Sequence, residues 1–411
     1  MLIKFGRRNF RIPDVVRFTK IPLTLRLRNL PVFLAYNIVP CIAAICILSG
    51  WRQPEYELLW GGSLLLLLFS RRSGLSRWAY TSLRVILLMI VLKYILPLSW
   101  VHNASFKAML IDFKWIYYLL WAILWVNFAG KTDLRVLYRC GRNMALGYCL
   151  FVMLQTIIAG GYSRQCTYLF GECNYVCYLM LIPYCFIRQM KGSQFDHLVF
   201  LLAVFLSDSR TGLASAVAIA AYPFYRQSRH KWIYWLGGMV FAVAYVKILF
   251  VGRGHSNVES VDRVMFLMQF LRSVGSFNLF QLFFGISPGE SVPLGEIVGG
   301  FAWHINVFES MHGIKGCYPF YFHSTYMRLF LVWGLPVVVW GMIWVVNMFR
   351  KTRSLSLRRF IILFLMESVS LSTLSLTNVS VIFFLVGVTL LLTHGKTAKR
   401  SLCFPRNPAR H

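Results

Sequence analysis

From Gly252 to His323 the chain reads GRGHSNVESVDRVMFLMQFLRSVG (252–275), SFNLFQLFFGISPGESVPLGEIVGG (276–300) and FAWHINVFESMHGIKGCYPFYFH (301–323). These 72 residues contain ten glycines, three prolines and five carboxylates, with no sustained apolar run. A helix that crosses a bilayer needs about 20 mostly apolar residues. We therefore interpret 252–323 as the one large segment in water, and the rest of the chain as membrane helices joined by short turns.

The composition supports this division. Hydrophobic residues make up 58% of the 411, and the mean hydropathy is +0.61, which is too apolar for a soluble domain. The sequence thus predicts an all-α polytopic membrane protein surrounded by membrane lipids. Its net charge of +29 does not indicate a nucleic-acid partner, because basic residues in the turns of a membrane protein set its orientation.

Twelve apolar runs outside the large segment are predicted to span the membrane. Three of them are short, so ten or eleven spans are the alternative. The runs lie at about 31–50, 57–70, 80–99, 115–130, 143–160, 167–187, 196–207, 211–225, 232–251, 325–349, 360–375 and 378–394. The predicted order is a basic cytoplasmic segment 1–30, transmembrane helices one to nine over 31–251, a large periplasmic loop 252–323, helices ten to twelve over 324–394, and a basic cytoplasmic tail 395–411. The first run has no cleavage site and is expected to remain as an anchor.

The basic residues give this topology its direction. With the N-terminus inside, the predicted cytoplasmic segments hold 30 of the 43 Lys and Arg, as the positive-inside rule requires. Both termini and the turn 350–359 are then cytoplasmic, and 252–323 is outside. Within this loop, apolar residues at helical spacing over 261–271 predict a short helix on the membrane surface, and the glycine-rich remainder is expected to be irregular.

Three residues on the outer side stand out as candidates for chemistry. Arg210 follows the seventh span, Arg263 begins the predicted surface helix, and His323 closes the loop before the tenth span. Two guanidinium groups suit a diphosphate, because each presents a planar fork of donors and keeps its charge. A nearby histidine can accept a proton from an attacking hydroxyl at neutral pH. Taken singly, however, interfacial arginines usually contact headgroup phosphate, and lone histidines are usually structural.

Other chemistries find little support. The chain has no P-loop, GxGxxG, HExxH or paired-aspartate motif, and its remaining histidines lack the spacing of metal ligands. Asp208 lies between two serines, but without the GxSxG turn of a serine hydrolase. Cys166 and Cys317 both fall on the outer side, where a disulfide between them is possible in an oxidising compartment; the other cysteines read as core residues.

Three short motifs resemble the O-antigen ligase and polymerase superfamily of bacterial polysaccharide synthesis. LSDSRTGL (206–213) is similar to the family's arginine-containing turn. VDRV (261–264) followed by FFGI (283–286) is similar to its loop arginine and later glycine. HSTY (323–326) followed by Gly334 is similar to its histidine element, although Ser324 stands where the family commonly has Asn and Pro336 follows the glycine closely.

The resemblance implies a specific reaction. Arg210 and Arg263 would bind the diphosphate of an undecaprenyl-diphosphate-linked glycan donor, and His323 would activate the acceptor hydroxyl. The transfer would be metal-independent and inverting, with no cofactor, at the periplasmic side of the bacterial inner membrane. An O-antigen ligase would join the glycan to the lipid A core oligosaccharide, as part of lipopolysaccharide biosynthesis.

Two other functions remain open at this point. Only one loop is large, and neither Arg210 nor Arg263 begins the Arg-x10-Gly pattern often found in the family's repeat-unit polymerases, so the ligase is favoured over the polymerase. A transporter is the more distant alternative, because Lys93, Lys247 and Glu367 lie inside apolar runs. A binding partner of the glycan without catalytic activity is a further possibility. Only the enzyme makes His323 indispensable.

Overall fold

The computed structural model describes residues 27–51, 53–70, 74–95, 104–169, 173–234, 236–237, 240, 262–371, 373–374 and 377–402. Every regular element in these ranges is a helix, and none is a strand, so the all-α class is confirmed. Within these ranges, three helical stretches are long and apolar enough to cross a membrane: Leu30–Leu48, Arg77–Ile95 and Phe106–Phe128. Four shorter apolar helices accompany them: Tyr56–Phe69, Gln194–Leu206, Val264–Gly275 and Thr377–Thr393.

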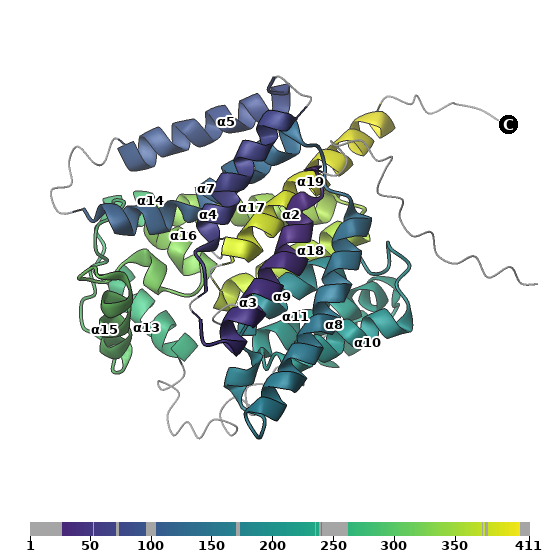
Figure 1. The fold of residues 1–411 in the computed structure, drawn as a ribbon. Helices are drawn as coiled ribbons and strands as arrows, with labels where there is room; N and C mark the ends of the chain where they lie inside the picture. Colours follow the sequence, from purple (N-terminus) through teal and green to yellow (C-terminus); the bar gives the residue numbers. More distant parts are fainter. Residues whose placement is uncertain are drawn as a thin grey trace, which may run out of the picture.

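The helices follow the predicted apolar runs closely over most of the chain (Figure 1). In order they are α2 (Leu30–Phe33), η1 (Leu34–Ile38), α3 (Val39–Leu48), α4 (Tyr56–Ser63), η2 (Leu64–Phe69), α5 (Arg77–Ile90), η3 (Val91–Ile95), α7 (Phe106–Phe128), α8 (Leu134–Ile158), η4 (Arg164–Thr167), α9 (Cys173–Tyr184), α10 (Gln194–Leu206), α11 (Arg210–Gln227), α13 (Asp262–Gly275), α14 (Leu279–Phe284), α15 (Phe301–His312), η6 (Pro319–Tyr321), α16 (Thr325–Trp333), α17 (Leu335–Lys351), α18 (Leu355–Ser370) and α19 (Thr377–Leu402). Most of the ninth predicted span, 232–251, and the start of the loop lie outside the described residues, as do both chain ends.

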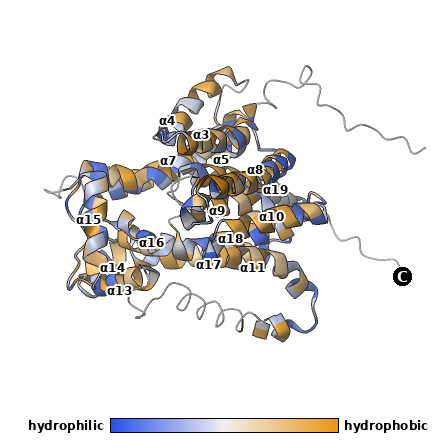
Figure 2. Ribbon diagram, turned by 60° about the horizontal axis from the view of Figure 1, so that its bottom comes forward, coloured by the Kyte–Doolittle hydropathy of each residue, from blue (hydrophilic) through white to orange (hydrophobic). Residues whose placement is uncertain are grey.

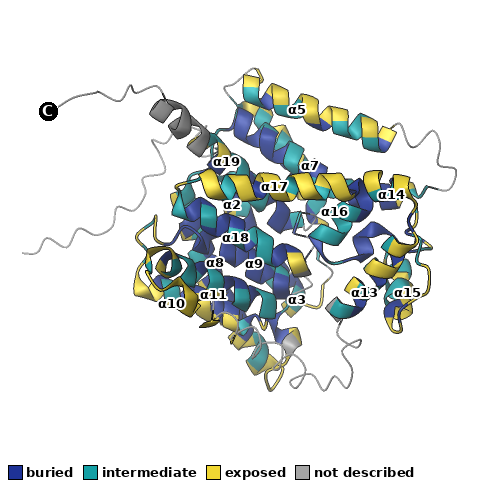
Figure 3. Cartoon of the chain, turned by 180° about the vertical axis from the view of Figure 1, so that it is seen from behind, coloured by how far each residue is buried: buried dark blue, intermediate teal, exposed yellow. Residues whose placement is uncertain are grey.

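Helix α9 forms the centre of the bundle. All of its residues except Tyr175 are buried, and it packs against α8, α10, α11, α18 and α19. A helix that is apolar on every side has no face to turn to water or to a headgroup layer, so it is stable only when surrounded. Figure 3 shows this buried interior between more exposed outer helices.

The outer helices carry apolar side chains on their exposed faces. Leu87 on α5 is 59% exposed and Trp340 on α17 is 67% exposed. Figure 2 shows that hydrophobic residues predominate along many of the helices of the bundle. Such a surface is unfavourable in water and suits the hydrocarbon of a bilayer, so the described helices fit a membrane location.

The predicted tenth span, 325–349, is two helices rather than one. Gly334 is the cap residue that ends α16 and also the cap residue that begins α17, and its φ is +78°. Pro336 lies in the first turn of α17, where its missing N–H costs no helical hydrogen bond. Glycine reaches positive φ without steric cost, so the pair Gly334 and Pro336 redirects the chain within an apolar run.

The helices of the large loop gather at one side of the bundle (Figure 1). Helix α13 confirms that the predicted segment 261–271 is helical, and the glycine-rich stretch 285–300 contains no helix, as expected. Helix α15 was not anticipated. It begins after Gly300 and ends at Gly313, and both glycines have positive φ. These glycines therefore mark the two ends of a helix and do not interrupt it.

Candidate functional site

Arg210 is the first residue of α11, after a tight turn that closes α10. Ser207 donates its Oγ proton to the Val204 carbonyl at 2.7 Å, and Asp208 adopts a φ of +51°. Ser209 caps α11, because its Oγ accepts the Gly212 N–H at 3.0 Å. The SDSRTG motif is therefore a helix-to-helix turn with a true N-cap. It places a guanidinium at the positive end of an 18-residue helix, where anions are favoured.

This turn is fixed to α9. The Ser209 Oγ donates to Asn174 Oδ1 at 2.7 Å, and both side chains are buried. A Cβ added to Gly212 would lie 2.1 Å from Cys177 Sγ, so only glycine lets α11 approach α9 so closely. The backbone that carries Arg210 thus has little freedom, and Arg210 itself is partly buried.

His323 lies between the loop helices and the bundle. Its ring meets the Phe266 ring of α13 edge-on, with centroids 4.9 Å apart, and the Phe308 ring of α15 at 6.0 Å. The next residue, Ser324, donates its Oγ proton to the Ser368 carbonyl at 3.0 Å. The hydroxyl of Ser324 thereby attaches the histidine segment to α18.

The end of α18 connects the two predicted regions. The fully buried Glu367 lies beside Ser215 of α11, and the following residue, Ser368, accepts the bond from Ser324. Helices α11 and α18 pack against each other. The helix of Arg210 and the segment of His323 therefore reach the same end of α18 from different elements.

Arg263 belongs to the first turn of α13. Its side chain lies outside the described residues, so the predicted approach of Arg263 to Arg210 is not tested by the structure. The backbone places position 263 one turn before Phe266, whose ring contacts His323. Helix α13 is thus the element through which the loop meets the histidine.

A cluster of buried hydroxyl groups lies at the start of α16, directly after His323 in the chain. The Oγ1 of Thr373 shares hydrogen bonds with Thr325 Oγ1 at 2.9 Å and with Ser368 Oγ at 2.8 Å. The Oγ1 and the backbone N–H of Thr325 both donate to the Leu371 carbonyl. All three side chains are at most 3% exposed. These bonds hold the start of α16, and with it His323, against the α18–α19 connection.

A buried ion pair continues this polar region one turn further along α16. Arg328 Nη2 lies 3.1 Å from Asp112 Oδ1 on α7, with the two side chains 11% and 3% exposed. A small pocket beside the pair is lined also by Trp115, Thr325 and Trp333. Charges this deeply placed are stable only when paired, so the pair fixes α16 relative to α7.

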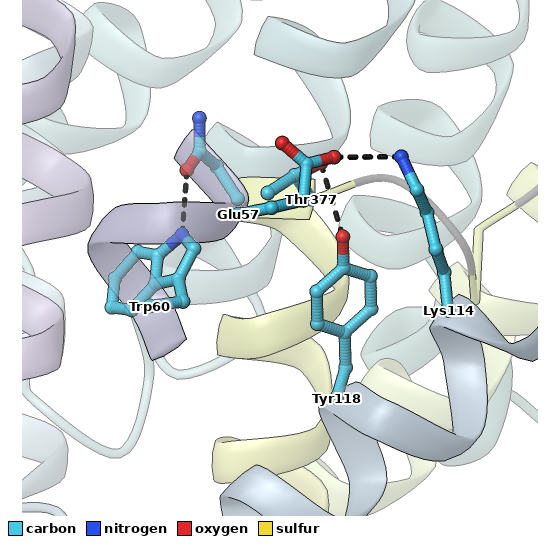
Figure 4. Close-up of polar contacts among 6 residues, drawn as sticks. Glu57, Trp60, Lys114, Tyr118 and Thr377 are labelled. Atoms are coloured by element: carbon cyan, nitrogen blue, oxygen red, sulfur yellow. Dashed lines mark hydrogen bonds and ion pairs between the residues drawn. The ribbon is translucent and has the colours of Figure 1, made fainter. Parts of the chain in front are cut away.

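A second polar network joins α4, α7 and α19 (Figure 4). Glu57 Oε1 accepts from Lys114 Nζ and from Thr377 Oγ1, each at 2.7 Å. Tyr118 donates to Thr377 Oγ1 at 3.1 Å, and Trp60 donates to the Asn378 side chain. Lys114 is two residues from Asp112, so the network and the buried ion pair belong to one polar layer of the bundle.

Glu367 on α18 is a second fully buried acid. Ser215 lies beside its carboxyl group, although the two side chains are too far apart or too poorly aligned for a regular hydrogen bond. The sequence singled out Glu367 only as a residue that can line a transport path. The structure places it between α9 and α11, where its charge bears on Cys177 and Tyr178.

The other transport candidates have different positions. Lys93 Nζ donates to the carbonyls of Phe284 and Ile286, at 2.7 and 2.8 Å. It therefore anchors the loop backbone around Gly285. Lys247 lies outside the described residues.

Titratable groups of the loop are affected mainly by burial. Burial, and then the charges of Lys107 and Lys114, lower the pKa of the His312 imidazole. Burial raises the pKa of the Cys317 thiol. Cys166 and Cys317 are both free thiols, so the disulfide considered from the sequence does not form here.

The sequence identified Arg210 and His323, but not the residues that hold them. Asn174, Ser324 and Thr373 look like ordinary polar residues of apolar runs, and the Asp112–Arg328 pair joins positions 216 residues apart. The available signal was the presence of charges inside apolar runs. Within the described part of the chain, no three His, Cys, Asp or Glu side chains are grouped to hold a metal ion.

Comparison with family models, with curated proteins and with solved structures finds no match to this chain.

Proposed function

We propose that the chain is a membrane glycosyltransferase of the O-antigen ligase type. It transfers a glycan from an undecaprenyl diphosphate carrier to the lipid A core oligosaccharide. The observation that carries the proposal is the arrangement at the end of α18: α11, the helix that begins at Arg210, and the segment of His323 both contact this end, and α13 contacts His323. An anion site and a titratable base at one end of a membrane bundle suit a lipid diphosphate substrate.

Each residue has a distinct role in the proposed reaction. Arg210 and Arg263 bind the diphosphate oxygens and stabilise the negative charge that grows as the sugar–phosphate bond breaks. The acceptor hydroxyl attacks the anomeric carbon from the opposite face. Its proton passes to His323, and the bonding electron pair leaves with the diphosphate. The donor's diphosphate linkage supplies the driving energy, so the reaction consumes no ATP and no cofactor.

The finer topology is part of this proposal. The twelve spans, with both termini inside and the loop 252–323 in the periplasm, place Arg210 and His323 on the outer face of the inner membrane. The concentration of basic residues in the other turns supports this direction. A reporter fused near Gly295 that is active only in the cytoplasm would overturn it.

The glycans that accumulate on the carrier lipid in cells without the protein test the proposed reaction. Disruption of the gene is expected to leave long glycan chains on the carrier lipid and a lipid A core without them. Accumulation of single repeat units on the carrier would instead identify the polymerase, which uses the same donor chemistry on another acceptor. Complementation with His323→Ala should fail, at normal protein level, in either case.

The transporter remains a second candidate because of Glu367. A fully buried carboxyl group inside a membrane helix is the kind of residue that carries protons in transporters. A transporter predicts that Glu367→Gln abolishes function while His323→Ala preserves it. The enzyme predicts that His323→Ala abolishes transfer, and the two hypotheses are separated by this pair of variants.

A further inference from the structure

Arg359, near the opposite end of α18, is buried without a partner among the described residues. It is one of the largest fully buried side chains of the described residues, and it is 1% exposed. Neither its Nε nor its Nη1 donates to an acceptor in the described part of the chain. Arg328, the other deeply placed arginine, has Asp112 at 3.1 Å. Arg359 therefore has no counter-charge among the described residues of the kind that Asp112 provides for Arg328.

The surroundings of Arg359 are positive rather than negative. Its charge acts on Tyr184 at the end of α9, on the following Cys185 and on His197 of α10, whose Nδ1 lies 3.2 Å from the Tyr184 hydroxyl. Arg188, whose guanidinium lies 5.0 Å from the centroid of the Phe224 ring, adds a second positive charge to the same region. The neighbouring carboxylate is Asp196, which is already engaged. It pairs with Arg142 at 3.5 Å and accepts the Ser193 N–H at 2.9 Å.

A bound anion would stabilise this buried guanidinium. A guanidinium does not lose its proton in a protein, and an unpaired buried charge is strongly unfavourable. An anion with several oxygens would satisfy the planar fork of donors, and phosphate has the matching geometry.

The position favours a phosphate carried by a lipid. His197 is partly buried, and the same helix exposes Leu198 (60%) and Phe205 (68%), so α10 presents a face for acyl chains next to the site (Figure 3). Arg188 is exposed at the adjoining turn. By the basic-residue distribution this end of the bundle faces the cytoplasm, where anionic headgroups meet basic pockets between membrane helices.

We propose that Arg359, Arg188 and His197 bind the headgroup phosphate of an anionic phospholipid. The site lies about 12 Å along α18 from Glu367, since eight residues separate them at 1.5 Å each. It is therefore separate from the proposed glycan-transfer site, and it does not depend on that function.

Native mass spectrometry and thermal unfolding of the purified full chain in neutral detergent test the site. The wild type should retain bound phosphatidylglycerol, and added phosphatidylglycerol should raise its unfolding midpoint by a few degrees, whereas phosphatidylcholine should not. Arg359→Met should lose this response while remaining folded, because an apolar side chain of similar length removes the buried charge. Arg353→Met removes an exposed arginine from the connection that precedes α18 and should retain the response.

Several results would overturn the proposal. An equal response of wild type and Arg359→Met would remove Arg359 from the site, and an equal response to phosphatidylcholine would remove the anionic phosphate. Full stabilisation by inorganic phosphate alone would assign the site to the free ion and refute the lipid. If Arg359→Met does not fold, the double variant Arg188→Met/His197→Gln replaces it, and an unchanged lipid response there would equally refute the site.

Discussion

Gly285 and Gly334 face each other where the loop crosses the break between α16 and α17. A Cβ on Gly285 would lie 2.4 Å from the Val332 carbonyl oxygen, and a Cβ on Gly334 would lie 2.3 Å from that of Phe283. The Ile286 N–H donates to the Leu331 carbonyl at 2.8 Å across the same crossing. Both glycines have positive φ, +73° and +78°. The backbone approach that they permit joins the large loop to the membrane bundle.

Replacement of either glycine by alanine should destabilise the protein strongly. Both glycines combine positive φ with ψ near 180°, a conformation that costs an alanine about 1–3 kcal/mol. The enforced overlap with backbone atoms adds about 1–3 kcal/mol. We expect Gly285→Ala and Gly334→Ala each to lower the unfolding midpoint measured in detergent, and to increase proteolysis within 262–323.

Gly313→Ala is the matched control for this prediction. Gly313 also has positive φ, +62°, but a Cβ there would meet nothing within 4 Å. It should therefore cost only the backbone strain. If all three variants lose the same stability, the close crossing contributes nothing beyond the conformation of the glycines.

The sequence predicted the helices well because their apolar runs are long, but it could not predict contacts between distant elements. The turn at Arg210 was located by the end of an apolar run, and the start of α13 by helical spacing. The break at Gly334 was missed because the apolar run 325–349 continues across Gly334 and Pro336 and is long enough for a single span. The bond from Ser324 to Ser368 depends on how α16 meets α18, and no local pattern encodes that.

The Asp112–Arg328 pair should be needed for folding more than for chemistry. Asp112→Asn leaves Arg328 buried and without its counter-charge, which typically costs about 3–5 kcal/mol. We expect a large fall in the unfolding midpoint for this variant in detergent.

The double variant Asp112→Leu/Arg328→Met separates this charge effect from packing. It removes both charges and keeps comparable volume, so it should recover most of the lost stability. A double variant that is less stable than Asp112→Asn would show that the ion pair is not the cause.

Acid should loosen the loop around α15. The lowered pKa of His312 means that the unfolded chain takes up a proton at the ordinary histidine pKa of about 6.5, before the folded chain does. The contribution of neutral His312 is thus complete above that pH and is lost as the pH falls towards the lower folded value.

Hydrogen exchange measures this effect. Protection of 301–316 should fall between pH 7 and pH 5.5, and His312→Gln should reduce the difference. The effect is expected to be modest, because the side chain is partly solvated and screened. His230→Gln, at an exposed position away from the loop, should leave the difference unchanged; a wild type with equal protection at both pH values would contradict the prediction.

Arg210→Lys should impair glycan transfer by the proposed enzyme although it keeps the charge. Lysine offers a point charge in place of the planar fork that contacts two phosphate oxygens. We expect weaker donor binding and slower transfer, measured with a lipid diphosphate donor at normal protein level. Arg226→Lys makes the same change at the other end of α11, about 24 Å away at 1.5 Å per residue, and should be nearly silent. Full activity of Arg210→Lys would argue against bidentate diphosphate binding.

His323→Gln should fold and bind the donor, yet transfer glycan about 10²–10⁴-fold more slowly, as expected for loss of a general base. Glutamine keeps a polar side chain between Phe266 and Phe308 but cannot accept the proton of the acceptor hydroxyl. His304→Gln is the matched control, because His304 also packs its ring against Phe266, at 5.0 Å, and has no proposed part in the reaction; it should transfer at a near-normal rate. Single-turnover assays separate binding from chemistry, and product analysis gives the anomeric configuration. Near-normal transfer by His323→Gln, or retention of configuration by the wild type, would rule out His323 as the base of an inverting displacement.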